Sequence, residues 1–176
     1  EFSFFSDRYD MFAFGKDELD VTNKDLLTKI IEEIKPDVFI QGASYHVVEA
    51  IENNIEYATR VNIDSLHTAA KACGKIGCRF INFSTNYVFG NVDYRKTENS
   101  FFDSADEGFG EEWFPHPCNV YGILKLTGEN IVASYCENYW NFRVAGLFGR
   151  LVLDQKMVII FLITFLQIWL KIKKLE

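Results

Sequence analysis

The chain has 176 residues, a length that fits one ordinary domain with a sizeable core. With 48% hydrophobic and 24% charged residues, its composition is that of a globular protein and excludes a disordered or fibrous one. The 25 acidic residues outnumber the 18 basic ones, and the net charge of −7 argues against general binding to a nucleic-acid backbone. A small phosphorylated ligand, held locally by backbone N–H groups and one or two cations, stays compatible with this charge.

The first half of the chain predicts strands that alternate with helices. Residues 10–14 (DMFAF) predict a short buried strand, and apolar residues at helical spacing predict a helix over 23–34 that Pro36 stops. Residues 37–41 (DVFIQ) predict a second strand that runs into small residues. A further helix is expected over 55–73, closing at Gly74.

The second half continues this alternation. Residues 79–83 (RFINF) predict a strand, 90–118 an irregular stretch, 120–137 a helix and 141–145 another strand. Strands that alternate with helices indicate βαβ units, and hence an α/β fold with a parallel sheet covered by helices on both faces. In such sheets ligands bind at the carboxyl ends of the strands, where residues 41–44 and 84–86 are expected.

The last segment differs from the rest. Residues 157–170 (MVIIFLITFLQIWL) are apolar on every face, but 14 residues at about 1.5 Å each are too short for the roughly 30 Å hydrocarbon core of a membrane. A buried helix is therefore expected, rather than a membrane span. The predicted division is an α/β domain over 1–150 and an apolar tail over 151–176.

The four cysteines form no C-x-x-C pair, and the three histidines are scattered. Zinc binding is therefore not expected. The cysteines are expected to be four reduced thiols in a cytoplasmic protein.

Tyr121 and Lys125 stand four residues apart on a predicted helix and therefore share one face. An ammonium group beside a phenol favours the phenolate, so this tyrosine could exchange a proton near neutral pH. The Thr85 hydroxyl at a neighbouring strand end could hydrogen-bond the same substrate oxygen. These groups suit proton delivery to a carbonyl that is being reduced by hydride. The alternative is a purely structural arrangement in which a solvated lysine packs over a tyrosine.

The wider sequence resembles the extended short-chain dehydrogenase/reductases, in particular the dTDP-4-dehydrorhamnose reductase (RmlD-like) branch. The residues that carry the resemblance are LDVT at 19–22, KPDVFIQGASY at 35–45, VN at 61–62, FSTNYVFG at 83–90, NVYGILKLTGE at 119–129 and FRVAGLFG at 142–149. The resemblance implies that residues 1–150 form a partial NAD(P)-binding, Rossmann-like domain with a doubly wound sheet. It also implies NAD(P)H-dependent reduction of a nucleotide-linked 4-keto-6-deoxy sugar. It implies no nucleic-acid or membrane partner, and a homodimer as one assembly.

The resemblance also implies residue roles. Tyr121 would be the general acid, Lys125 would tune it and hold the nicotinamide ribose, and Thr85 would bind the substrate oxygen together with Asn86. Further cofactor-binding residues would be Asp20 and Val21 near the adenine and the small residues Gly42, Ala43 and Ser44 in a close turn. Asn62 matches an asparagine that braces the central helix. For the small residues, tight packing between strand and helix is the alternative.

Several departures from the family pattern qualify these expectations. The first strand and its Gly-rich phosphate-binding turn are absent, and most of the substrate-binding portion is replaced by the apolar tail, so a chain truncated at both ends is expected. Asn86 stands where Asp is common, and Gly146 where many members have Trp. Lys16 stands where an acidic residue often selects NADH, which favours NADPH; both cofactors stay open.

Two alternatives to an active reductase stay open. One is a non-catalytic subunit similar to the regulatory β subunit of methionine adenosyltransferase, whose partner would be the catalytic subunit of that synthetase. The other is an incomplete form without activity of its own.

Overall fold

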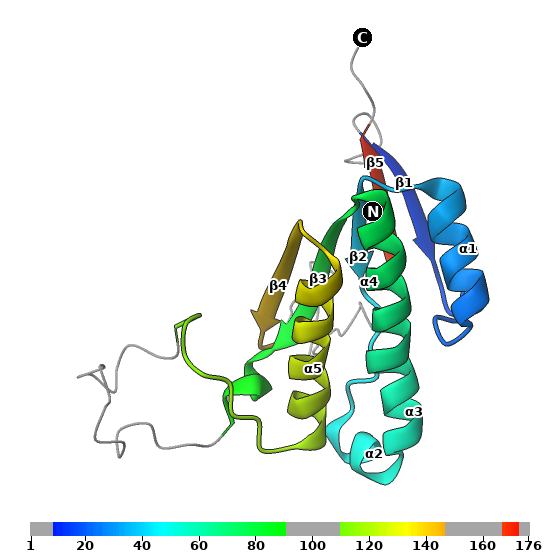
Figure 1. Cartoon of the computed structure of the whole chain (residues 1–176). Coiled ribbons are helices and arrows are strands. Elements are labelled where there is room, and N and C mark those ends of the chain that lie inside the picture. Colours follow the sequence, from blue (N-terminus) through cyan, green and yellow to red (C-terminus); the bar gives the residue numbers. More distant parts are fainter. Residues whose placement is uncertain (1–8, 91–109, 147–166, 173–176) are drawn as a thin grey trace, which may run out of the picture.

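The computed structural model describes residues 9–90, 110–146 and 167–172; for Tyr9 and for 167–172 it describes the backbone only (Figure 1). Its elements follow in the order β1 (Tyr9–Phe14), α1 (Lys24–Ile34), β2 (Val38–Gln41), α2 (Val48–Asn53), α3 (Ile55–Thr59), the π-helical turn η2 (Arg60–Asp64), α4 (Ser65–Ile76), β3 (Arg79–Thr85), the 3₁₀ turn η3 (Asn86–Phe89), α5 (Val120–Tyr135), β4 (Tyr139–Val144) and β5 (Gln167–Ile172).

The described strands form one five-stranded sheet in the order β1-β5-β2-β3-β4. β2, β3 and β4 are parallel, so the alternating pattern correctly predicted βαβ units. β5 pairs antiparallel with both β1 and β2 and separates them. The sheet is therefore mixed, whereas a purely parallel one was expected.

The long helices lie side by side in one layer, in front of the sheet in Figure 1. Each of α1, α4 and α5 connects two successive strands of the series β1, β2, β3, β4, which advances across the sheet in one direction. Because such crossovers are right-handed, connections that advance in one direction place their helices on the same face. Within the described ranges, the expectation of helices on both faces is therefore wrong.

Local signals in the sequence explain most helix ends. The Asn23 side chain accepts a hydrogen bond from the Leu26 N–H and begins α1, while Lys35 in the left-handed region ends it just before Pro36. The run α3–η2–α4 covers 55–76 and ends at Gly77, three residues beyond the predicted Gly74. Gly77 has a φ of 70°, a conformation that glycine adopts without steric cost. The short helix α2 was not predicted.

The main core lies between the helix layer and the sheet. The rings of Phe39 on β2 and Phe80 on β3 are fully buried, with centroids 4.9 Å apart. Leu27 and Ile31 of α1 and the alanine-rich face of α4 pack against them. Small alanines on α4 let that helix approach the sheet closely, so the core is continuous from α1 to α5.

The expected buried helix over 157–170 is wrong for the residues that the structure describes there. Gln167–Ile172 form strand β5, and residues 157–166 lie outside the described ranges. The β-branched and aromatic residues of this segment suit a strand as well as a helix, and a short apolar run does not distinguish the two. Among the described residues, no helix is long and apolar enough to cross a membrane.

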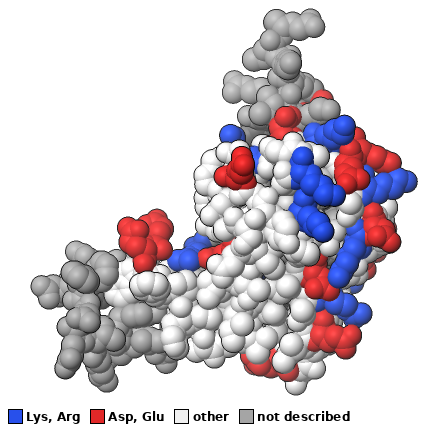
Figure 2. All heavy atoms as spheres, viewed as in Figure 1, with Lys and Arg blue, Asp and Glu red and all other residues white. Residues whose placement is uncertain are grey.

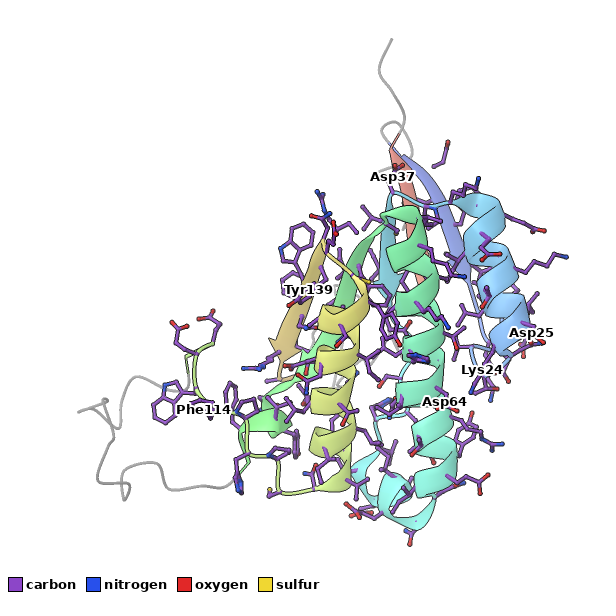
Figure 3. All side chains as sticks on the ribbon, viewed as in Figure 1. Lys24, Asp25, Asp37, Asp64, Phe114 and Tyr139 are labelled. Atoms are coloured by element: carbon purple, nitrogen blue, oxygen red, sulfur yellow. The ribbon has the colours of Figure 1, made fainter. Side chains whose placement is uncertain are left out.

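Charged side chains gather over α1 and the adjoining flank of α4, whereas the surface over α5 is mostly uncharged in the view of Figure 2. Lys24 at the start of α1 reaches Asp64 before α4, with 3.0 Å between Nζ and Oδ2; both are labelled in Figure 3. This pair is exposed, so it is expected to add little stability.

Candidate active site

The predicted site residues come from the carboxyl ends of β2 and β3 and from the N-terminal half of α5. Ser44 follows β2, Thr85 ends β3, and Tyr121 and Lys125 lie on successive turns of α5. Asn119 caps α5, because its side chain accepts a hydrogen bond of 2.8 Å from the Gly122 N–H. A Cβ at Gly122 would lie 2.6 Å from the Tyr87 carbonyl oxygen, so only glycine lets the start of α5 come this close to η3.

Tyr121 and Thr85 are brought together by this packing. Their hydroxyl groups share a hydrogen bond, and the Tyr87 ring meets the Tyr121 ring edge-on with centroids 5.9 Å apart. Burial raises the pKa of Tyr121 above its usual value, and the Thr85 hydrogen bond opposes this only in part. The expectation that Lys125 would promote the phenolate is therefore wrong for this structure. The phenol keeps its proton at neutral pH, which is the form that a proton donor needs.

Lys125 lies between α5 and the segment that follows β2. Its Nζ donates a hydrogen bond of 3.4 Å to Ser44 Oγ. Burial lowers the pKa of Lys125 to about 8, and the charge of Glu129 one turn further along α5 opposes this decrease. The pKa of the nearby His46 is lowered too, mainly by burial and in part by the Lys125 charge.

The family pattern implied that Asn62 braces the central helix, and in the structure its side chain joins η2 to the turn after β2. Its side chain is buried, accepts the Tyr45 N–H at 2.9 Å and donates to the Tyr45 carbonyl at 2.8 Å. The Ser44 hydroxyl donates to the same amide oxygen at 3.3 Å. Asn62 stands in the π-helical turn η2, a type of distortion that often occurs at functional sites. It therefore positions Ser44, which in turn contacts Lys125.

Thr85 and Asn86 occupy the junction between β3 and η3. The Thr85 hydroxyl accepts the Tyr87 N–H at 3.3 Å and lies 3.4 Å from Asn86 Oδ1. Thr85 is buried, whereas Asn86 is exposed. A ligand could therefore contact Asn86 from solvent, with Thr85 behind it.

The residues expected near the adenine line a pocket on the β1 side of the site. Its lining residues are Lys16, Leu19, Asp20, Val21, Ala43, Tyr57 and Val61. The Asp20 carboxylate accepts hydrogen bonds from the hydroxyl and the N–H of Thr22, which lower its pKa. Lys16 and Arg60 both lie over the Tyr57 ring, within 6 Å of its centroid at 5.9 and 5.7 Å. The pocket thus combines apolar walls with the Asp20 carboxylate and the Lys16 ammonium group, and Arg60 lies over the ring of Tyr57, which lines it.

A second, smaller cavity lies behind Lys125. Gln41, Ala43, Asn62, Leu66, Asn82, Lys125 and Gly128 line it. Gly42 is buried between Gln41 and Ala43, next to both cavities. Hence the structure places Gly42, Ala43 and Ser44 between the pocket and Lys125, although Gly42 itself lines neither cavity.

The site contains an ion pair that the sequence patterns did not predict. Glu129 on α5 is bound by Arg143 on β4 and by the Ser84 hydroxyl on β3. The available signal was its position, four residues after Lys125 and eight after Tyr121, on the same helix face. Among the residues that the structure describes, no cluster of histidine, cysteine or acidic side chains could hold a metal ion.

Comparison with known proteins identifies the family. The family model of the RmlD substrate binding domain matches residues 3–167. A dTDP-4-dehydrorhamnose reductase from Escherichia coli (strain K12) is 30% identical over 131 residues, 74% of this chain and 40% of that protein. The methionine adenosyltransferase 2 subunit beta of Danio rerio is 30% identical over 128 residues, 73% of this chain and 35% of that protein.

Solved structures agree with this match. The crystal structure of dTDP-4-dehydrorhamnose reductase from Bacillus anthracis in complex with NADP has a TM-score of 0.67 and 29% identity, and covers 78% of this chain and 45% of that one. The chain thus spans less than half the length of these three proteins. Because the family model matches almost all of it, the chain belongs to the family of the RmlD substrate binding domain, and the resemblance drawn from its motifs is confirmed.

Proposed function

We propose that this chain carries the proton-transfer site of an NADPH- or NADH-dependent reductase that acts on a nucleotide-linked 4-keto-6-deoxy sugar. The observation that carries the proposal is the contact between Tyr121 and Thr85, with Lys125 one turn away on the same helix. The reductases named above, one of them in complex with NADP, support the choice of substrate class and cofactor.

The residues of the pocket fit a dinucleotide cofactor. Leu19, Val21 and Ala43 would face the adenine, and Asp20 would lie near the ribose that the adenine carries. Lys16 and Arg60 would favour the additional phosphate of NADPH, because Lys16 lines the pocket and Arg60 lies over the ring of Tyr57, which also lines it. Lys125 and Ser44, with Gly42 close by, would hold the nicotinamide ribose. When bound, this cofactor supplies the hydride that reduces the keto carbon.

The protein residues then handle the proton and the orientation of the sugar. Tyr121 would donate its phenolic proton to the keto oxygen, which becomes the hydroxyl of the product. Thr85 would hydrogen-bond the same oxygen and orient it toward the phenol, and Asn86 would contact the sugar.

Substitution of Tyr121 tests this proposal. With dTDP-4-dehydrorhamnose and NADPH, Tyr121→Phe should lower turnover about 100-fold or more, the usual contribution of a general acid. Tyr87→Phe is the matched control, because it keeps the edge-on ring contact with Tyr121 and should retain turnover. Loss of NADPH absorbance measures the rate. Wild-type turnover in the Tyr121 variant would contradict the assignment.

Binding of the cofactor is measured separately from turnover. Quenching of tryptophan fluorescence by NADPH and by NADH, with thermal shift as a second readout, should show saturation and tighter binding of NADPH. Lys16→Ala and Arg60→Ala should weaken NADPH more than NADH. An equal loss of affinity for NADPH and NADH would contradict a role of these two residues in recognising the additional phosphate.

A non-catalytic subunit is the second candidate function. The similarity to the Danio rerio protein favours it, as do Asn86 and Gly146 at positions where active relatives commonly have Asp and Trp. Co-purification with the catalytic subunit of a methionine adenosyltransferase, with no turnover of the keto sugar, would establish this function. Absence of the complex at micromolar concentrations would argue against it.

Assembly and location are further parts of the proposal. A homodimer is supported by the largely uncharged surface over α5, on which Ile123 and Tyr135 are exposed (Figure 2). Light scattering measures the mass directly, and a monomer would contradict this assembly. The proposed location is the cytoplasm. The buried free thiols of Cys73, Cys78 and Cys136 are consistent with it.

A further inference from the structure

Glu129 connects three elements through one buried carboxylate. Glu129 is only 6% exposed. Oε1 accepts hydrogen bonds from the Ser84 hydroxyl on β3 and from Arg143 Nε on β4, the latter at 3.0 Å; Oε2 accepts Arg143 Nη2 at 2.8 Å. Both oxygens are therefore occupied by donors from the sheet, and helix α5 is attached to the ends of two strands.

Arg143 is held on its other sides as well. Its Nη1 donates to the Glu111 carbonyl at 3.2 Å, and its guanidinium lies over the Phe89 ring, 5.1 Å from the centroid. The Glu129 carboxylate raises the pKa of Arg143 further. A buried ion pair of this kind contributes little net stability, because desolvation of both charges offsets their attraction. Stability alone therefore does not explain why a carboxylate stands at this position.

The pair does determine where the reacting groups lie. Ser84 immediately precedes Thr85, and it stands opposite Arg143 in the register of β3 and β4. Glu129 lies two turns after Tyr121 on α5. The carboxylate thus ties the helix that carries Tyr121 to the strand end that carries Thr85, and these two residues share the hydrogen bond described above.

The charge of Glu129 also reaches Lys125. The groups that face Lys125 are Glu129 from α5, and the Ser44 hydroxyl and His46 from the segment after β2. Glu129 is the acidic group among them, and residues four apart on a helix are neighbours. Its carboxylate therefore opposes the effect of burial on the ammonium group.

We propose that Glu129 is a positioning residue of this site: with Arg143 as its counterion it holds the Tyr121–Lys125 face of α5 against the end of β3 and supplies the negative charge that Lys125 faces. The roles of Tyr121 and Lys125 rest on the proposed function. The placement of Glu129 and its effect on Lys125 do not, and the test below uses no turnover.

Competitive labelling of lysines tests the proposal on the full chain. Trace acetic anhydride is added across a pH series, and the extent of acetylation of the Lys125 peptide is read by mass spectrometry. In Glu129→Gln, which keeps the shape and an acceptor oxygen, the labelling profile of Lys125 should move about one pH unit toward lower pH, because a facing negative charge is lost. Glu137→Gln removes an exposed carboxylate just beyond the same helix and should leave the profile unchanged.

A merely structural role predicts the opposite sign. If the substitution only loosened the site, water would reach Lys125 and its profile would move toward higher pH, nearer the ordinary value for lysine. An unchanged or upward-shifted profile in Glu129→Gln therefore overturns the proposal.

Should Glu129→Gln fail to fold, the double variant Glu129→Gln/Arg143→Gln leaves neither charge unpaired and carries the same prediction. A downward shift of its Lys125 profile supports the proposal, and an unchanged or upward shift overturns it. Wild-type turnover in Tyr121→Phe, by contrast, would contradict the proposed function while leaving this labelling result in place.

Discussion

Replacement of Asn62 by alanine should destabilise the protein strongly. The amide is 5% exposed and makes two hydrogen bonds to the Tyr45 backbone, at 2.9 and 2.8 Å, and a longer one with the Ser44 hydroxyl. Alanine would leave a donor and an acceptor of the Tyr45 backbone without these partners. At roughly 1–1.5 kcal/mol for each group, the free energy of unfolding should fall by about 2–3 kcal/mol.

Urea denaturation followed by circular dichroism measures this change. A loss of about 2–3 kcal/mol in a chain of this size corresponds to a decrease in Tm of roughly 4–12 °C. Asn62→Asp keeps an acceptor for the Tyr45 N–H but loses the donor to the Tyr45 carbonyl, so its destabilisation should arise from that one bond and from the new charge. The control is Asn53→Ala, an exposed side chain on α2 whose single hydrogen bond goes to the Glu49 carbonyl.

The comparison between the two asparagines decides the outcome. Asn53→Ala should change the free energy of unfolding by less than about 0.5 kcal/mol, as surface substitutions usually do. If Asn62→Ala were no more destabilising than Asn53→Ala, the turn after β2 would not depend on this amide, and the reasoning would be refuted.

Three further predictions concern titration, close packing and thiol reactivity. Since the pKa of Lys125 is lowered to about 8 in the folded state, Lys125 is more protonated in the unfolded chain than in the folded one between pH 8 and 10. The free energy of unfolding should therefore rise across this pH range relative to that of Lys125→Met. If the urea midpoints of the wild type and of Lys125→Met stayed equal across the range, the burial of that charge would be contradicted. Gly122→Ala should lower the free energy of unfolding by about 1–2 kcal/mol despite the better helix propensity of alanine, because the new Cβ would meet the Tyr87 carbonyl oxygen. A higher Tm of the variant would show that η3 moves to accommodate the methyl group. Of the four thiols only Cys118 is exposed, and burial raises the pKa of Cys136 to about 11, so a thiol reagent at pH 8 should show one fast phase that Cys118→Ser removes; a fast phase that persists would show that a buried thiol is accessible.

The sequence predicted the elements whose signals are local. Asn23 and Pro36 bound α1, and the strands at Val38–Gln41 and Arg79–Thr85 were found within two residues because each is a short apolar run between a turn and a helix. The i, i+4 spacing of Tyr121 and Lys125 placed both on one face of α5 without any knowledge of the fold. The motifs likewise identified the family, which the comparisons then confirmed.

Features that depend on distant segments could not be predicted in this way. β5 lies antiparallel between β1 and β2, and no local pattern in an apolar run specifies its secondary structure or its partners. The pKa of Tyr121 is raised because packing around α5 buries the phenol, whereas sequence proximity to Lys125 alone predicted a decrease. Glu129 pairs with Arg143, 14 residues away, and with Ser84, 45 residues away.

The sequence by itself therefore determined the alternating elements, the family and the residue types available for proton transfer, because these depend on periodicity and short motifs. Only the tertiary structure decided which of those residues meet. Right-handed crossovers place α1, α4 and α5 on one face, and the parallel pairing of β2, β3 and β4 aligns their carboxyl ends. The contacts of Tyr121 with Thr85 and of Glu129 with Ser84 and Arg143 follow from that alignment and from the burial it creates.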